Sequence, residues 1–324
     1  MSAWRHLSAR ALDAGMCAMM YAIQRRHRLH AGSRAELERY IADHAPLSRD
    51  AYFHGVPIDL PAPEAHGAPG VLSWPSPITT AFSENNRTQI LFFPTTKSES
   101  APTVFMLHAL MSASDRGYRQ WAARFNAAGW NACFVHLPYH YSRTPRDHRN
   151  GELAITANLI RNGEALRQGV SELRQLMAWL RVRGTTEFGL WACSYGGWIG
   201  ALLASVERDF RFVALLEPIV DVGHAIWQSP TGLALRRELR VHRIPPEVIE
   251  GHFPLVSPRH GQPLCGGDRV LFAAGDYDTI ARAEDIRQLH KQWAGSSLLT
   301  EPQGHFGYRL MPAAWAWLRE RAML

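Results

Sequence analysis

The stretch FGLWACSYGGWIG, residues 188–200, predicts a strand, a very tight turn and the beginning of a helix. Its first six residues form a short apolar run, and apolar residues recur at helical spacing after the two glycines. A strand that becomes a helix within a few residues needs strained backbone angles at the apex and small side chains two positions before and after it. Ala192 and Gly196 meet this need on either side of Ser194. We expect the Ser194 hydroxyl to lie above the carboxyl end of a sheet, beside a helix N-terminus that favours negative charge. The alternative is an ordinary strand-to-helix turn.

The composition is that of a globular protein with a packed core. Of 324 residues, 46% are hydrophobic and 20% are charged, enough for one large α/β domain with an insertion or for two small domains. The net charge of +6 favours anionic partners, but the basic residues are scattered and no nucleic-acid-binding motif accompanies them, so we expect no nucleic acid partner. The four cysteines are widely separated, which predicts a reducing compartment and a cytoplasmic location.

The N-terminal region predicts helices and an irregular connector, which we group as an extension over residues 1–84. Residues 14–23 form an apolar run with Asp13 before it and arginines after it, the reverse of a signal peptide and about half the length needed to cross a bilayer. An amphipathic helix is expected there, packed on the domain surface or in peripheral contact with a membrane. Residues 34–44 predict a charged helix. Residues 57–77 are rich in proline and glycine and predict a connector, with a short strand near Ile58.

Buried strands alternate with helices over residues 85–324, which predicts a mostly parallel, doubly wound sheet flanked by helices. The expected strands are residues 87–94, 103–108, 131–137, 188–193, 212–216, 269–274 and 297–300. The expected helices are residues 118–128, 155–183, one after Ser194 and one from about residue 312.

Residues 221–263 interrupt this alternation with helical pieces at 233–239 and 246–250 between prolines and glycines. Because this insertion lies between two strands, we expect it over the carboxyl edge of the sheet, either as a lid or pocket wall or as a plain surface excursion.

A nucleophilic serine needs a base, and the base needs an orienting carboxylate. The strand at 269–274 runs into Asp276 and Asp278, and the last strand runs into a loop that contains His305. The resulting chain order, Ser, Asp, His, with each residue after a different strand, is the order of the α/β-hydrolase triad. We therefore predict a triad of Ser194, His305 and one of these two carboxylates, with Glu217 as the alternative acid.

At this point the chain resembles the α/β-hydrolase superfamily over residues 85–324. That family's usual Gly-x-x-Asp pattern, matched by Gly275 and Asp278, implies Asp278 as the triad acid and Asp276 as a turn or supporting residue. The His108-Ala109-Leu110 segment is similar to that family's His-Gly segment, whose following loop supplies one backbone N–H of the oxyanion hole. The resemblance implies Leu110 or Met111, together with Tyr195, as oxyanion donors. Ala109 replaces the usual glycine, which leaves the choice between Leu110 and Met111 open.

Residues 138–147, followed by the long helix and the Ser-Tyr-Gly-Gly elbow, resemble the eighteenth abhydrolase-domain-containing family, which implies hydrolysis of acyl esters or lipids. Tyr139, His140 and Arg143 follow a strand at the active-site edge, and with His108 and Met111 they are candidate substrate-binding residues. Cationic side chains at this edge could hold an anionic substrate group, or they could form structural salt bridges.

The predicted reaction is hydrolysis of a small-molecule or lipid-like ester, without metal or cofactor. His136 and His140 are four residues apart but Pro138 separates them, so they do not match a helical zinc motif, and no nucleotide-binding motif is present. The same triad would serve an acyltransferase or a thioester or amide hydrolase. A non-catalytic binding module of the same fold is the alternative from another class.

Overall fold

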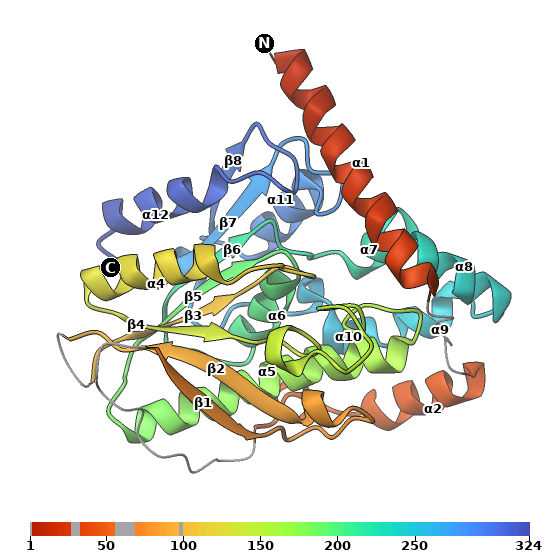
Figure 1. The fold of residues 1–324 in the computed structure, drawn as a ribbon, viewed down its shortest axis with the longest axis horizontal. Helices are drawn as coiled ribbons and strands as arrows, with labels where there is room; N and C mark the ends of the chain where they lie inside the picture. Colours follow the sequence, from red (N-terminus) through yellow and green to blue (C-terminus); the bar gives the residue numbers. More distant parts are fainter. Residues whose placement is uncertain (1, 27–32, 56–68, 97–99) are drawn as a thin grey trace.

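An eight-stranded sheet runs through the centre of the computed structural model, which describes residues 2–26, 33–55, 69–96 and 100–324 (Figure 1). The strand order is β1-β2-β4-β3-β5-β6-β7-β8. All neighbours are parallel except β2, which pairs antiparallel with β1 and β4. The strands are β1 (Gly70–Pro75), β2 (Arg87–Phe93), β3 (Thr103–Leu107), β4 (Asn131–Val135), β5 (Phe188–Cys193), β6 (Phe210–Leu216), β7 (Val270–Gly275) and β8 (Ser297–Glu301). The predicted mostly parallel sheet is confirmed.

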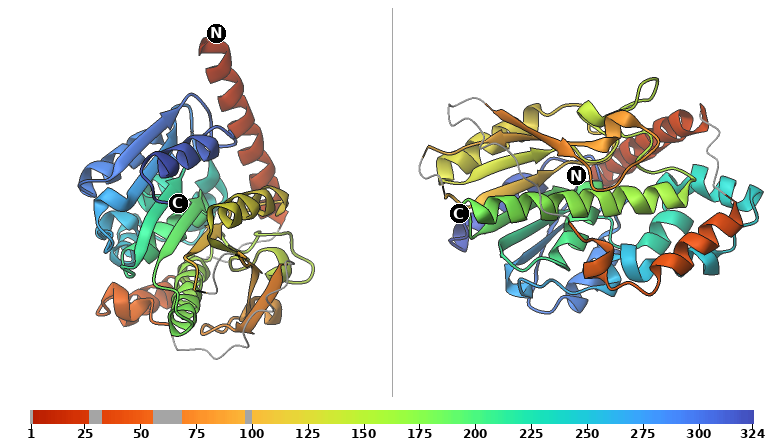
Figure 2. Two further views of the ribbon diagram at one scale, coloured as in Figure 1. Left: turned by 90° about the vertical axis from the view of Figure 1, so that its left-hand side faces the viewer. Right: turned by 90° about the horizontal axis from the view of Figure 1, so that it is seen from below.

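Helices cover both faces of this sheet (Figure 2). One face packs against α4 (Arg116–Ala128) and α12 (Leu310–Glu320), and the other against α5 (Leu159–Val182), α6 (Tyr195–Ala204) and α11 (Ala283–Gln292). The two cores follow from the alternation of side chains along each strand. In β3, Val104 and Met106 enter one core while Phe105 and Leu107 enter the other.

The sheet begins earlier in the chain than the sequence indicates. We predicted an irregular connector over residues 57–77. This prediction is wrong for residues 70–75, which form β1, pair with β2 and bury Leu72 and Trp74. The core sheet therefore starts before the predicted domain boundary at residue 85. The short strand expected near Ile58 lies outside the described residues.

The long central helix begins later than its apolar pattern suggests. We predicted it from Ile155, but α5 begins at Leu159, where the side chain of Asn158 accepts a hydrogen bond from the N–H of Arg161. Asn162 also binds the backbone of Thr156 at both its N–H and its carbonyl, which holds residues 156–158 in a turn. Polar side chains thus decide the start of this helix, as is usual at N-caps.

The N-terminal region forms α1 (Ser2–Arg26), α2 (Arg34–His44) and α3 (Arg49–Tyr52), which confirms the helix predicted over 34–44. The insertion contains α7 (Val222–Trp227), α8 (Leu233–Val241), α9 (Pro246–Glu250) and α10 (Phe253–Val256). The N-terminal part of α1 extends beyond the rest of the molecule (Figures 1 and 2). Among the helices in the described ranges, none is long and apolar enough to cross a membrane.

Candidate active site

Ser194 lies at the apex of a strained turn between β5 and α6. Its φ of 51° and ψ of −114° are rare for a residue with a side chain. Its N–H donates to the carbonyl of Leu216 in β6 at 2.8 Å. Gly196 approaches β3 so closely that a Cβ there would lie 2.6 Å from the carbonyl oxygen of His108. Neighbouring strands on both sides therefore hold this turn, and the small residue predicted at position 196 is required.

A continuous chain of hydrogen bonds joins Ser194, His305 and Asp278. Ser194 Oγ lies 2.8 Å from His305 Nε2, and His305 Nδ1 lies 2.7 Å from Asp278 Oδ2. The other carboxylate oxygen of Asp278 accepts hydrogen bonds from the N–H groups of Ile280 and Ala281 at 2.7 and 2.8 Å. Asp278 therefore has a fixed orientation, and it orients the imidazole toward Ser194.

The electrostatic setting favours a charged His305. Burial alone would lower its pKa, but the charge and hydrogen bond of Asp278, with the carboxylates of Glu217 and Asp13 behind it, outweigh burial and raise the pKa of His305 to about 9. A ring that gains a proton easily can take one from a hydroxyl group.

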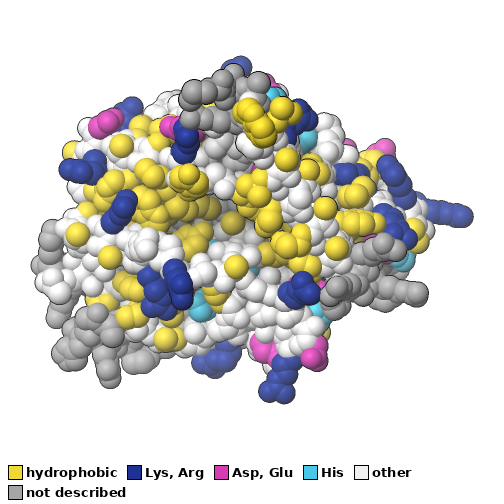
Figure 3. All heavy atoms as spheres, turned by 45° about the horizontal axis from the view of Figure 1, so that its top comes forward, with side chains coloured by type: hydrophobic (Ala, Val, Ile, Leu, Met, Phe, Trp, Pro, Cys, Tyr) yellow, Lys and Arg dark blue, Asp and Glu magenta, His cyan; other side chains and the backbone are white. Residues whose placement is uncertain are grey.

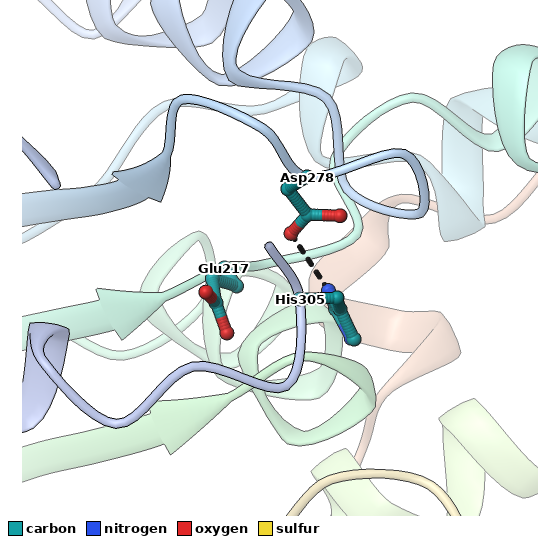
Figure 4. Close-up of side chains that lie close together, drawn as sticks. All are labelled: Glu217, Asp278 and His305. Atoms are coloured by element: carbon teal, nitrogen blue, oxygen red, sulfur yellow. Dashed lines mark hydrogen bonds and ion pairs between the residues drawn. The ribbon is translucent and has the colours of Figure 1, made fainter. Parts of the chain in front are cut away.

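The other two candidate acids do not orient His305. Asp276 forms an ion pair with Arg287 at 3.3 Å near the surface. Glu217 is buried and accepts a hydrogen bond from Gln303 Nε2 at 2.6 Å, and burial raises its pKa to about 8. Figure 4 shows Glu217 beside the Asp278–His305 pair but outside it.

Glu217, Asp278 and His305 also form a cluster whose potential ligand atoms lie within 4.8 Å of one another. Such a cluster could hold a metal ion in principle. Both ring nitrogens of His305 already bind Ser194 and Asp278, however, and one oxygen of Glu217 binds Gln303. A metal would have to break these hydrogen bonds, so the residues fit a hydrogen-bonded chain better than a metal site.

A residue that the sequence analysis did not assign to the site, Asp13 of α1, contacts both loops of this chain. Its carboxylate accepts hydrogen bonds from the N–H of His305 at 3.1 Å and from the N–H and hydroxyl of Thr279 at 3.1 and 3.2 Å. Asp13 is only 1% exposed, and burial raises its pKa. The signal in the sequence is helical spacing, because Asp13 shares a face with Cys17 and Met20, which are also buried.

The backbone around Ser194 distinguishes the oxyanion candidates. The N–H of Met111 donates to His140 Nε2 at 3.1 Å, so this donor is already occupied. Within the described ranges, the N–H groups of Leu110 and Tyr195 have no hydrogen-bond partner, and both residues line the same cavity as Ser194. The geometry favours Leu110 over Met111, the choice that the sequence left open.

The predicted substrate-binding residues after β4 are buried parts of the loop and do not line the cavity. Arg143 forms two hydrogen bonds to Glu172 at 2.6 and 2.8 Å, and both side chains are 1% exposed. Tyr139 donates its N–H to Asn85, and burial lowers the pKa of His140 to about 4, which keeps its Nε2 available to Met111. Arg143 therefore forms a structural ion pair, which is one of the two alternatives that the sequence left open for the cationic residues at this edge.

His108 is also fully buried. Its Nε2 accepts a hydrogen bond from the N–H of Leu137 at 3.2 Å, and burial lowers its pKa well below the usual value. A neutral His108 thus joins the loops after β3 and β4 and supports the position of Leu110.

A cavity of about 160 Å³ opens at Ser194 and His305. Its walls are almost entirely apolar. Most of them come from three parts of the chain that are distant in sequence, the N-terminal helices, α5 and the insertion, and the loop after β8 adds Phe306. The apolar wall residues include Met20, Leu37, Ile41, Leu159, Leu166, Ile226, Leu235, Ile249, Val256 and Phe306. The insertion therefore forms a wall of the pocket, which is one of the two alternatives predicted for it.

Comparisons with known proteins define the fold. An acetyl xylan esterase from a Paenibacillus species has a TM-score of 0.61 at 12% identity, covering 94% of this chain and 98% of that one. Acetyl xylan esterase 1 from a Thermoanaerobacterium species has a TM-score of 0.56 at 14% identity, covering 94% and 97%. An α/β hydrolase from a Penicillium species has a TM-score of 0.53 at 12% identity, covering 78% and 96%. The chain has the α/β-hydrolase fold.

The sequence comparisons cover less of the chain than the structural ones. No protein-family model matches the chain, so the narrower family resemblance stays a prediction. An uncharacterised protein found in two strains of Mycobacterium tuberculosis is 27% identical over 143 residues, which is 44% of this chain and 34% of that protein. The chain thus aligns with about a third of the length of these relatives.

Proposed function

We propose that this protein is a serine hydrolase that cleaves carboxylic esters and holds an apolar acyl group in the cavity. The observation that carries this proposal is the hydrogen-bonded chain Ser194–His305–Asp278, at 2.8 and 2.7 Å, at the opening of an apolar cavity. The fold neighbours that are named as esterases are consistent with this chemistry.

In the first half of the reaction, Ser194 Oγ attacks the ester carbonyl carbon while His305 Nε2 accepts the hydroxyl proton. The carbonyl oxygen becomes an oxyanion near the N–H groups of Leu110 and Tyr195, where each donor is worth about 3–4 kcal/mol in the transition state. The bond to the alcohol oxygen then breaks, and His305 gives its proton to the departing alcohol. The acyl group remains on Ser194.

In the second half, His305 accepts a proton from water as the water oxygen attacks the acyl carbon. The bond to Ser194 breaks, the serine oxygen regains the proton from His305, and the carboxylic acid leaves. Asp278 holds the imidazole in one tautomer throughout.

Two alternatives use the same site differently. An alcohol that replaces water as the acceptor would make the protein an acyltransferase, and thioesters or amides could replace the ester. A non-catalytic module would bind an apolar ligand in the cavity without turnover. Ser194 lines the cavity and is hydrogen-bonded to His305, and this arrangement supports an enzyme over such a module.

The test is intact-mass spectrometry after reaction with a fluorophosphonate, on the wild type and on Ser194→Ala, together with hydrolysis of p-nitrophenyl esters of increasing chain length. We expect a single adduct that the substitution abolishes, and turnover that increases from acetate to longer acyl chains. Adduct formation at another residue, or equal turnover by Ser194→Ala, would refute the proposal. Turnover that increases on adding an acceptor alcohol would favour the acyltransferase.

A further inference from the structure

α1 has two opposite faces, and only one of them packs against the rest of the protein. Its buried face carries Asp13, Cys17 and Met20. Its opposite face exposes large apolar side chains, of which Trp4 is 80% and Leu7 67% exposed. Exposed apolar residues concentrated on one helix face differ from the singly scattered ones that are normal on protein surfaces.

The charged residues of α1 are mostly basic. Its sequence contains four arginines and a single acidic residue, Asp13, which faces the protein interior. Arg10 is exposed on the described part of the helix. Exposed Trp and Leu side chains can enter the headgroup region of a membrane, and a basic side chain near them is attracted to anionic lipid.

The buried face of α1 contacts a loop that borders the opening of the cavity. Gly304 packs against Ala9 and Asp13 of α1, and a Cβ at Gly304 would lie 3.1 Å from that of Ala9. Two residues along the same loop, Phe306 lines the cavity and is itself 42% exposed. Figure 3, which brings the top of Figure 1 toward the viewer, shows several separate groups of hydrophobic side chains on this face of the molecule, with Lys and Arg side chains between them.

We propose that α1 docks this protein on an anionic lipid surface, with Trp4 and Leu7 entering the interface and the cavity opening beside Phe306 turned toward the lipid. Docking stands on the exposed face of α1 alone. The further consequence, that the ester substrate is taken from that surface, rests on the proposed hydrolase function.

The experiment measures sedimentation of the full chain with vesicles of phosphatidylcholine alone and of phosphatidylcholine with phosphatidylglycerol. The test variant is Trp4→Glu with Leu7→Glu. The matched control is Val182→Glu, because Val182 is an equally exposed apolar residue, at 85%, at the far end of α5. We expect the wild type and the control to bind anionic vesicles, binding to weaken as salt is added, and the double variant to bind about tenfold or more weakly.

Two further measurements separate this proposal from its rivals. Turnover of a short water-soluble ester should be equal in all three proteins, so that loss of docking is distinguished from loss of the proposed activity. Light scattering without lipid should show the same mass for the wild type and the double variant. No binding to anionic vesicles, equal binding by the double variant, or a dimer that the double variant dissociates would overturn the proposal.

Discussion

Replacing Asp13 by Ala tests whether the N-terminal helix is part of the active site. Asp13 accepts hydrogen bonds from the loop that follows β7, at Thr279, and from the loop that follows β8, at His305. Without the carboxylate, two backbone N–H groups and one hydroxyl lose their acceptor in a buried place. The two loops that carry Asp278 and His305 would then lose their common anchor.

The expected magnitude follows from these contacts. A buried donor left without a partner costs about 1–3 kcal/mol, and the Thr279 hydroxyl can turn to another acceptor while the two backbone groups cannot. We therefore expect the free energy of unfolding to fall by about 2–4 kcal/mol after local relaxation. A displacement of His305 by about 1 Å from Ser194 would lower kcat by about 100-fold. KM should change less, because Asp13 does not line the cavity.

The pH dependence of the reaction distinguishes an electrostatic effect of Asp13 on His305 from a purely structural one. Asp13 is one of the carboxylates that raise the pKa of His305 to about 9. His305 must be neutral to accept the serine proton, so kcat/KM of the wild type should rise with pH up to about that value. Removing the Asp13 charge lowers the pKa of His305, and the acid limb of the profile should shift to lower pH.

The assay is the pH profile of kcat/KM, together with kcat, for a p-nitrophenyl ester, with urea denaturation to measure the stability of each protein. The control is Cys17→Ala, one turn further along the same buried face of α1 and without a hydrogen bond to either loop among the described residues. Unchanged kcat and an unchanged acid limb in Asp13→Ala would refute the reasoning. Equal losses in Cys17→Ala would show that any truncation of this face has the same effect.

Three further outcomes are expected. Asp278→Asn should lower kcat by about 10³–10⁴-fold in steady-state kinetics, while Glu217→Gln should lower it less than about tenfold, and the reverse order would make Glu217 the orienting acid. Gly196→Ala places a Cβ against backbone atoms of β3 and should destabilise the protein by about 1–3 kcal/mol in urea denaturation, so an unchanged midpoint would contradict the elbow geometry. Arg143→Met leaves the buried Glu172 carboxylate unpaired and should cost about 3–5 kcal/mol of stability, part of which the added Glu172→Gln substitution restores. If Arg143 instead binds substrate, Arg143→Met would leave the free energy of unfolding unchanged and would raise KM.

Chain order and local pattern were sufficient to find the elements that carry Ser194, Asp278 and His305. The tight turn at Ser194 needs small neighbours in sequence, and Asp278 and His305 each follow a buried strand, so their positions at one sheet edge follow from parallel topology. The pattern failed where a strand lacks a clear period, as in β1, and where polar caps decide a boundary, as at Asn158.

The sequence by itself determined the sheet, the elbow and the identity of the three residues that meet in one hydrogen-bonded chain, because these depend on local periodicity and on strand order. Only the tertiary structure decided what surrounds them. It brought Asp13 from the first helix to the loops of Thr279 and His305, buried Arg143 against Glu172, and enclosed the cavity with segments distant in sequence. Such contacts depend on which faces pack together across the whole chain, and a side chain's type and neighbours in sequence do not fix that packing.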